Sequence, residues 1–302
     1  MFLPIFLPDH AGQALRQFAQ TAEGLGFDSL WTGDHVAVPR DAASRYPYAK
    51  ELVATGFLTD PEAAAALMPS GLPDALGILQ FVAACTERMR LGTSVLILPM
   101  RNPVLTAQAV ATLDVVSEGR AILGVGVGWN REEFAVLGAS FEHRGPRTDD
   151  YLEVMRRLWT LDDPSFVGRY YEIGDVAFYP KPIQDPHPPL WFGGNEEPAL
   201  RRTVRFDGAW HFAYLDADTV RVRARRLGEL AVDAGKDPSS FAVTGERLDL
   251  LAMPPAEARR EIAALEAAGV SHLVVGLPLD LTESLGQMEV FAHEVIRAWR
   301  DE

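Results

Sequence analysis

The chain has 302 residues, of which 48% are hydrophobic, and its formal net charge is −14. This excess of acidic residues argues against a nucleic acid or an anionic membrane as a partner. The length suits one or two domains, and an eight-fold β/α barrel needs roughly 250 residues. The single cysteine, Cys85, is expected in the core of a protein from a reducing compartment.

The first residues show neither the basic start nor the apolar core of a signal peptide. No segment approaches the roughly 20 apolar residues of a membrane span. We therefore expect a soluble, cytoplasmic protein.

Strand and helix patterns alternate from the beginning of the chain. Residues 2–7 are predicted as a buried strand, 11–25 as an amphipathic helix and 27–31 as a second strand. The pattern dissolves at 36–73, with one helical stretch at 61–67, and long loops of this kind often carry function. Asp74 is placed to cap the helix that follows.

Residues 90–129 form the most regular part of the pattern. An apolar run at 91–98 is broken by Asn102-Pro103, and residues 104–117 then have helical spacing. A second apolar run, rich in glycine, covers 121–127. This order predicts two buried parallel strands joined by a helix. Ligands on such sheets bind at the carboxyl ends of the strands.

The rest of the chain continues the alternation. Helices are predicted at 132–137, 149–161, 198–206, 219–234, 255–268 and 281–295, and strands at 190–192, 208–212, 241–244 and 272–275, with 248–252 as a competitor for the seventh strand. About eight β/α repeats without a linker predict a single (β/α)8 TIM-barrel domain over 1–302. Its insertions, at about 36–73 and 141–189, are expected at the carboxyl-end face. An open doubly wound sheet is the alternative.

Functional side chains of a barrel come from the carboxyl ends of its strands. This criterion selects Asp34, His35, Ser94, Val95, Gly126, Gly128, Trp129, Asn130, Gly193, Gly194, Asn195, His211 and Tyr214. The run Gly124-Val125-Gly126-Val127-Gly128 does not open a long helix, so it is no dinucleotide fingerprint. Its alternating glycines either let a flat ring approach the backbone or fit the taper of the barrel, and both interpretations stay open.

Two further positions indicate chemistry. Gly193-Gly194-Asn195 precedes a helix, whose first N–H groups suit a phosphate. His35 can exchange a proton near neutral pH, and Asp34 can orient it. Arg101, Arg144 and Arg147 are candidate anion contacts. The histidines show no metal-binding spacing, so no metal is predicted.

These residues resemble the bacterial luciferase-like monooxygenase superfamily, and most closely its probable coenzyme F420-dependent oxidoreductases. The resemblance rests on motifs in the expected order: Phe27-Asp28-Ser29-Leu30-Trp31, Asp34-His35, Arg90-Leu91-Gly92-Thr93-Ser94-Val95, Arg101-Asn102-Pro103, Leu113-Asp114, Ser117-Glu118-Gly119-Arg120, Gly124 to Trp129, Glu132-Glu133-Phe134, Arg144-Gly145 and Gly193-Gly194-Asn195.

The resemblance implies a barrel that holds a flavin or deazaflavin at its carboxyl-end face. A non-prolyl cis peptide at Ser94–Val95 would support the ring, and His35 would face its reactive part. The implied cofactor-binding residues are Asp34, Ser94, Val95, Gly126, Gly128, Trp129, Gly193, Gly194 and Asn195. Some relatives carry a proton-donating glutamate at the position of Trp129, so their proton-transfer scheme does not carry over.

The implied function is hydride transfer between coenzyme F420 and an unidentified small organic substrate. The alternatives are an FMN-dependent monooxygenase that uses O2 and reduced flavin from a separate reductase, or a flavin-binding protein without turnover. An aromatic substrate pocket is expected under the insertions, lined by Tyr46, Tyr48, Phe57, Phe166, Tyr170 and Tyr171. The family often dimerises through helices beside the second to fourth strands, so a homodimer is expected.

Overall fold

The computed structural model describes residues 1–3, 11–37, 43–54, 72–276 and 281–301. Its main sheet is parallel. Seven strands follow one another in the order β1 (Ser29–Thr32), β2 (Arg90–Thr93), β4 (Ala121–Gly126), β7 (Leu190–Gly193), β8 (Ala209–Ala213), β9 (Val243–Arg247) and β10 (Val270–Val275). The short strand β3 (Leu96–Ile97) pairs with β4.

The first three residues close the sheet into a barrel. The Phe2 amide donates to the Val275 carbonyl at 2.9 Å, at the edge formed by β10. On the other side, the Leu3 amide donates to the Trp31 carbonyl of β1 at 2.7 Å. These contacts confirm the predicted (β/α)8 barrel over the open sheet. Most of the strand predicted at 2–7, and the helix predicted at 61–67, lie outside the described residues.

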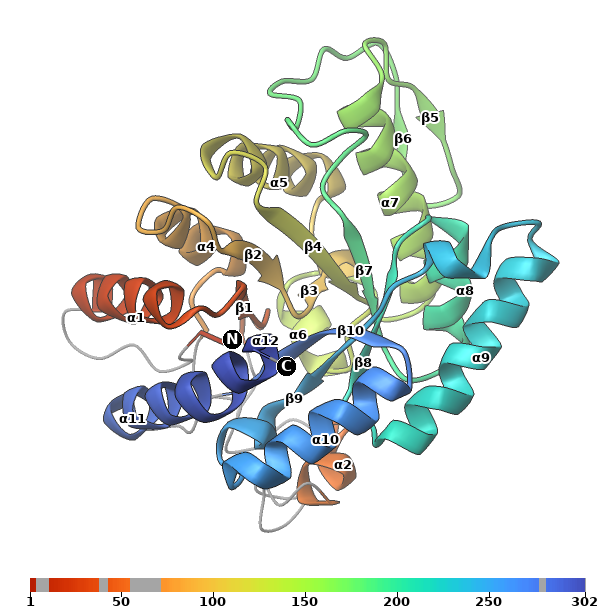
Figure 1. The fold of residues 1–302 in the computed structure, drawn as a ribbon. Coiled ribbons are helices and arrows are strands. Elements are labelled where there is room, and N and C mark those ends of the chain that lie inside the picture. The colour runs from red at the N-terminus through yellow and green to blue at the C-terminus, as the bar shows by residue number, and fades with distance from the viewer. Residues whose placement is uncertain (4–10, 38–42, 55–71, 277–280, 302) are drawn as a thin grey trace.

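Helices surround the barrel in chain order, as Figure 1 shows. They are α1 (Ala11–Leu25), α4 (Ala75–Ala83), α5 (Pro103–Val116), α7 (Arg144–Thr160), α8 (Glu197–Arg205), α9 (Ala217–Asp233), α10 (Pro255–Ala267) and α11 (Leu281–Phe291). Shorter elements are α2 (Ala49–Ala54), α6 (Arg131–Val136), α12 (Ala298–Asp301), the π-helical turn η4 (Ala292–Arg297) and the 3-10 turns η1 (Leu98–Met100), η2 (Pro238–Ser240) and η3 (Leu248–Leu251). No helix in the described ranges is long and apolar enough to cross a membrane.

Capping residues set several of these boundaries. The Asn102 side chain accepts hydrogen bonds from the Val104 and Leu105 amides, and Pro103 opens α5. The Asp74 carboxylate caps α4 in the same way, as expected. The helix predicted at 149–161 begins earlier than expected, because α7 already starts at Arg144. The seventh strand is β9, whereas the competing stretch forms the turn η3.

The barrel interior is aromatic. Trp31 of β1 and Trp191 of β7 stack with their ring centroids 4.6 Å apart, and Ile122, Ala209 and Val274 complete this cluster. A Cβ on Gly92 would lie 2.2 Å from the Trp31 ring, so the neighbouring strand needs glycine there. Filling the interior with rings leaves ligands only the strand ends.

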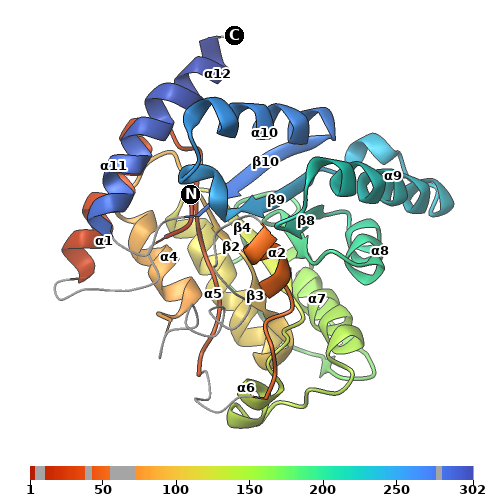
Figure 2. The same cartoon turned by 90° about the horizontal axis from the view of Figure 1, so that it is seen from below.

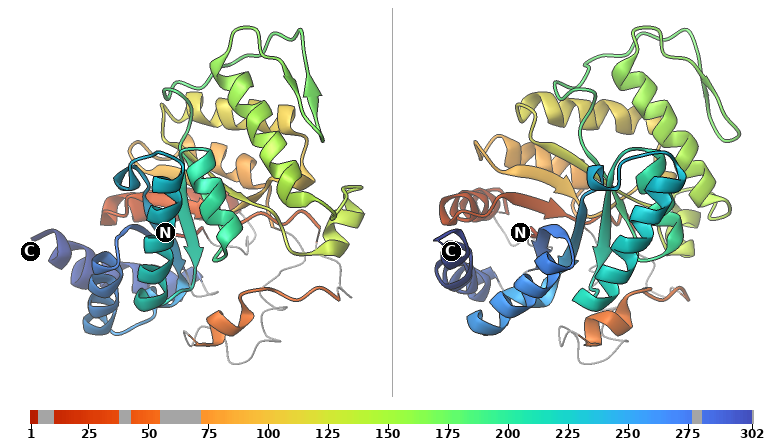
Figure 3. Two further views of the ribbon diagram at one scale, coloured as in Figure 1. Left: turned by 90° about the vertical axis from the view of Figure 1, so that its right-hand side faces the viewer. Right: turned by 45° about the vertical axis from the view of Figure 1, so that its right-hand side comes forward.

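Helix α2 and the hairpin β5–β6 (Phe166–Val167, Glu172–Ile173) lie far apart on the molecule, as Figures 1 and 3 show. Figure 2 shows α2 in front of the barrel strands. The Gln184 side chain donates to the carbonyl of Ala121, where β4 begins. The Leu123 amide, near the same strand end, donates to the Pro189 carbonyl at 2.9 Å. Residues 184–189 therefore pack at the amino ends of the strands, and for them the expected position over the carboxyl-end face is wrong. The turn of the hairpin instead lies along α7, where the Tyr171 hydroxyl accepts a hydrogen bond from Asn102 at the start of α5.

Candidate functional site

A cis peptide lies at the carboxyl end of β2. The Ser94–Val95 bond is cis, as the family resemblance implied, and it separates β2 from β3. The Val95 side chain occupies the space that glycines leave on the neighbouring strands. A Cβ on Gly126 would lie 2.4 Å from Val95 Cγ2, and one on Gly193 would lie 2.8 Å from Val95 Cγ1. These glycines therefore make room for Val95, so the space beside their backbone is not open to a ring.

His35 is oriented by a carboxylate from another element. Its Nδ1 lies 2.8 Å from Glu133 Oε2, and the Glu133 side chain is fully buried. The Val36 amide donates to Glu133 Oε1 at 2.7 Å. Glu133 comes from α6, which Asn130 caps. The sequence argument had expected Asp34 in this orienting role, and the structure assigns it to Glu133.

Asp34 is engaged in a different contact. Its two carboxylate oxygens accept hydrogen bonds from Arg101 Nη2 at 2.6 Å and Arg101 Nε at 3.1 Å. The Ile97 amide donates to Asp34 Oδ2 at 2.8 Å. Burial would lower the pKa of Arg101, but the hydrogen bond and charge of Asp34 outweigh it and raise that pKa. Asp34 thus ties the end of β1 to β3.

Trp129 stands on the rim beside His35. The two ring centroids are 5.8 Å apart, and the centroid of the Tyr46 ring lies 5.6 Å from that of Trp129. Tyr48 packs edge-on against both Tyr46 and Tyr214. An aromatic band therefore runs along the mouth of the barrel, from the end of β4 to the end of β8.

The other expected pocket aromatics lie elsewhere. Tyr171 packs against Tyr151 of α7, with ring centroids 5.4 Å apart. Arg157 of α7 lies over the Phe166 ring. Tyr170 follows in the same insertion, its amide bonded to Asp150 of α7. Phe57 lies outside the described residues. Of the six candidates, Tyr46 and Tyr48 are the ones placed at the mouth.

The turn after β7 is fastened to β8. The Gly194 amide donates to the His211 carbonyl at 3.1 Å. The Asn195 side chain forms two hydrogen bonds with the Ala213 backbone, each 2.9 Å long. Helix α8 starts directly afterwards, as predicted. These contacts of Gly194 and Asn195 fix the position of the start of α8.

The three candidate anion-binding arginines are also engaged. Arg101 pairs with Asp34, and Arg144 Nε donates to the Gly128 carbonyl at 3.0 Å. The Arg144 guanidinium lies over the Phe141 ring, and Arg147 donates to the Ser140 and Glu142 carbonyls. Gly128 packs against Ile97 and Phe134. These groups brace the rim around Trp129.

A second polar cluster lies inside the barrel mouth. Ser94 Oγ lies 2.8 Å from His211 Nε2 and also contacts Glu246 Oε1. His211 Nδ1 lies 2.9 Å from Thr244 Oγ1. Sequence reasoning selected Ser94, His211 and Tyr214 but missed Glu246, because the predicted strand ended at 244. An alternation continued to Thr244 and Glu246 would have placed both on the inner face.

Burial dominates the ionisation of this cluster. It raises the pKa of Glu246 to about 7, although hydrogen bonds from Ser94 and Tyr214 act in the opposite direction. Burial, with a smaller contribution from His272, lowers the pKa of His211 to about 3. The pKa of Tyr214 is raised well above its ordinary value, first by burial and then by Glu246. All three side chains therefore favour their neutral forms.

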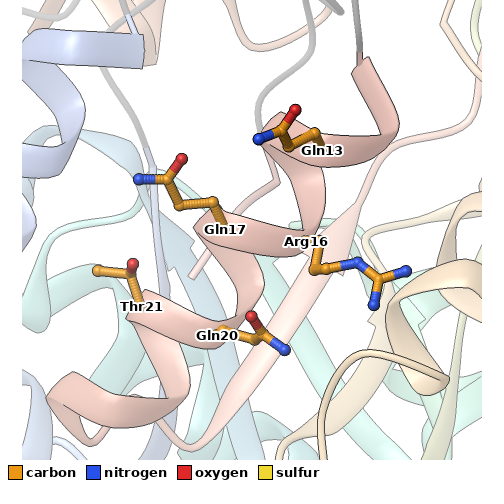
Figure 4. Close-up of a pocket in the computed structure, with 5 residues that line it drawn as sticks. All are labelled: Gln13, Arg16, Gln17, Gln20 and Thr21. Atoms are coloured by element: carbon orange, nitrogen blue, oxygen red, sulfur yellow. The ribbon is translucent and has the colours of Figure 1, made fainter.

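A separate hollow lies on helix α1. Figure 4 shows its lining residues, Gln13, Arg16, Gln17, Gln20 and Thr21, all from that one helix. The opposite face of α1, with Leu15 and Phe18, packs into the core. The hollow thus faces outward, away from the strand ends, and holds no group suited to redox chemistry.

Comparison with known proteins agrees with this geometry. The family model of luciferase-like monooxygenases matches residues 2–297. A Mycobacterium tuberculosis protein of uncharacterised function is 31% identical over 287 residues, covering 92% of this chain and 93% of its own. An F420-dependent glucose-6-phosphate dehydrogenase of Amycolatopsis mediterranei is 36% identical over 174 residues, covering 56% of this chain and 44% of its own.

Solved structures share the fold at low sequence identity. The monooxygenase RslO1 from Streptomyces bottropensis superposes with a TM-score of 0.78 at 19% identity, covering 99% of this chain and 98% of its own. A second structure is the oxygenating constituent of 3,6-diketocamphane monooxygenase from Pseudomonas putida in complex with FMN. It superposes with a TM-score of 0.73 at 16% identity, covering 98% of this chain and 96% of its own. The chain therefore belongs to the luciferase-like monooxygenase family and is an oxidoreductase of that superfamily.

Proposed function

We propose that the chain transfers hydride between coenzyme F420 and a small organic substrate. The observation that carries this proposal is the His35–Glu133 pair, 2.8 Å apart, after β1, whose neighbour β2 ends in the cis Ser94–Val95 peptide. Hydride transfer to or from a carbonyl or alcohol needs a proton partner beside the reacting carbon. His35 supplies such a group where the family resemblance places the reactive part of the cofactor.

The residues at the mouth fit a flat ring with a phosphate arm. Ser94 and Val95 are partly exposed, and so are Gly193 and Gly194 across from them. The buried Nδ2 of Asn130, the residue that caps α6, has no hydrogen-bond partner among the described residues. A buried donor without a partner is the kind of group that a ligand or an ordered water satisfies. The start of α8 would offer a phosphate the Glu197 amide, since Pro198 has no N–H and the Ala199 amide donates to the Glu196 carbonyl.

The bound cofactor would supply the hydride chemistry. The chain would position the substrate and exchange a proton with it. Glu133 Oε1 accepts from a backbone amide, and its Oε2 faces His35 Nδ1. With Nδ1 donating to Glu133, His35 Nε2 is left to take or give the proton. Trp129 cannot donate such a proton to an alkoxide as a glutamate does, so it would wall the pocket. Asp34 would hold the strand end that carries His35.

Coenzyme F420 is preferred to FMN on the strength of sequence similarity. An F420-dependent dehydrogenase is 36% identical over 174 residues, which is 56% of this chain, and this similarity supports the choice. FMN remains the alternative, since the shared fold suits both ring systems. In that case O2 would be the co-substrate, and a separate reductase would supply reduced flavin.

The test is a titration of the purified protein with F420 and with FMN, followed by absorbance and fluorescence. We expect F420 binding with a spectral shift, and substrate-dependent bleaching of the oxidised cofactor. Tight FMN binding without F420 binding would replace the proposal by the monooxygenase alternative. Binding of either cofactor with no turnover on a panel of alcohols and ketones would favour a non-catalytic protein. His293→Ala, at an exposed helical position, is the matched control for His35 variants.

We also propose a homodimer that forms through helices beside the second to fourth strands. Helix α5 in that region exposes Leu105 and Val116, with 67% and 52% of their surface accessible. Exposed apolar side chains on one helix are a feature of association surfaces. Light scattering of the wild type and of Leu105→Arg would measure the mass. The proposed location is the cytoplasm.

A further inference from the structure

We propose that Glu132 is a positioning residue of the site: it holds the segment 43–48, so that the ring of Tyr46 stays at the mouth of the barrel. The role of this ring toward a substrate rests on the proposed function. Glu132 lies in the first turn of α6, directly before Glu133. Its contacts are separate from those of Glu133, which orients His35.

Glu132 accepts hydrogen bonds from two successive backbone amides. The Ala43 amide lies 2.9 Å and the Ser44 amide 3.2 Å from the same oxygen, Glu132 Oε1. Successive N–H groups that point at one oxygen form a concave site for an anion. Such bonds to a carboxylate are stronger than bonds to a neutral acceptor. The contact therefore fixes the direction of the backbone at these two residues.

The segment returns a hydrogen bond to the helix. Arg131 is the first residue of α6, so its amide has no acceptor within the helix itself. The Ser44 hydroxyl oxygen accepts a hydrogen bond from this amide at 3.2 Å. The segment and the first turn of α6 therefore hold each other. Displacement of the segment would leave an unpaired amide at the start of the helix.

The next residues of the segment carry the aromatic rings of the mouth. The centroid of the Tyr46 ring lies 5.6 Å from that of Trp129, and the Tyr46 hydroxyl lies 3.3 Å from that of Tyr214. The Tyr48 ring packs edge-on against Tyr46 and Tyr214. Tyr46 follows Ser44 by two residues, which span at most about 7 Å. A backbone fixed at Ser44 therefore restricts where the Tyr46 ring can lie.

Glu133 uses the same arrangement on another part of the chain. The Val36 and Ala37 amides lie 2.7 and 3.3 Å from Glu133 Oε1. The second oxygen of Glu133, Oε2, faces His35 Nδ1. Glu132 Oε2, by contrast, is buried and has no partner among the described residues. Glu132 therefore makes no contact with the imidazole, and we expect it to affect the position of the rings and not proton transfer.

The direct test needs no cofactor. Hydrogen exchange followed by mass spectrometry reports how firmly the amides of the segment 43–48 are held. Glu132→Ala should speed their exchange by about tenfold or more, because two amides lose their acceptor. Glu132→Gln keeps a carbonyl oxygen at this place and should restore slow exchange. The amides of Val36 and Ala37 should stay protected in both variants and should respond instead to Glu133→Ala.

Asp218→Ala is the matched control. Asp218 also lies in the first turn of a helix, α9, and its side chain is 90% exposed. Its loss should leave exchange in the segment 43–48 unchanged. Unchanged exchange in Glu132→Ala would overturn the positioning role, and so would exchange that is equally fast in Glu132→Ala and Glu132→Gln. Faster exchange throughout the chain in Glu132→Ala would overturn it too, since this is the sign of a merely structural role.

The role toward a substrate is tested separately, with the alcohol or ketone that the wild type turns over fastest. Glu132→Ala should raise KM by about tenfold and leave kcat within about twofold, because the rings bind the substrate while His35 stays oriented. Glu132→Gln should restore KM. A fall in kcat with KM unchanged would overturn this role. Absence of turnover in the wild type would overturn the proposed function and this role with it, whereas the exchange data still decide whether Glu132 holds the segment.

Discussion

Two carboxylates at the barrel mouth have opposite surroundings. Glu133 meets donors: two backbone amides and the His35 imidazole. Glu246 meets hydroxyls, and burial raises its pKa to about 7. One glutamate therefore acts as a fixed acceptor that orients a histidine, and the other as an acid that holds a proton. Environment, and not residue type, divides these roles.

Replacing His35 by Ala removes the partner of Glu133 and should have the largest effect on turnover. We expect turnover to fall by about 10²- to 10⁴-fold, since the side chain is proposed to transfer the proton in the transition state. Cofactor Kd should change much less. Steady-state kinetics and binding titration measure the two quantities. His293→Ala should leave both unchanged, and an equally large loss in that control would point to general damage.

Glu246→Gln tests the second carboxylate through the pH dependence of the free energy of unfolding. The folded protein holds a proton on Glu246 up to about pH 7, whereas the unfolded chain loses it near 4.5. The raised pKa stabilises the fold below the unfolded value, and this contribution is lost as pH rises through the folded value. The free energy of unfolding of the wild type, relative to the variant, should fall by about 3 kcal/mol over that window. Urea denaturation at several pH values measures it, and a constant difference would contradict the assignment.

Gly126→Ala tests how tightly Val95, in the cis Ser94–Val95 peptide, packs against the neighbouring strand. The new Cβ would lie 2.4 Å from Val95 Cγ2, so either Val95 or the strand must shift. We expect a loss of about 1–3 kcal/mol in the free energy of unfolding, the usual cost of overpacking. Gly286→Ala in α11, with no atom within 4 Å of the new Cβ, is the control and should stabilise by about 0.5–1 kcal/mol. Equal changes in the free energy of unfolding for the two variants would show that Gly126 is not needed to make room for Val95.

Periodicity predicted most elements of the barrel, because each strand and helix buries a face that recurs along the sequence. Helix α1 spans Ala11–Leu25 as expected, and the cap at Asp74 was visible from its residue type. The start of α7 was missed, since polar residues at 144–148 hide a helix whose apolar face comes later. The position of residues 184–189 at the amino ends of the strands was also missed, because a loop carries no periodic signal for the end of the barrel that it covers.

The sequence by itself determined the barrel class and the strand ends that can carry chemistry, and it selected His35 as a candidate. The partners were decided only by tertiary structure. Glu133 lies 98 residues from His35, and Glu246 lies 152 residues from Ser94. Such distances along the chain leave no local pattern, because closure of the barrel alone brings these side chains together. Their burial, and hence their protonation, exists only in the closed barrel.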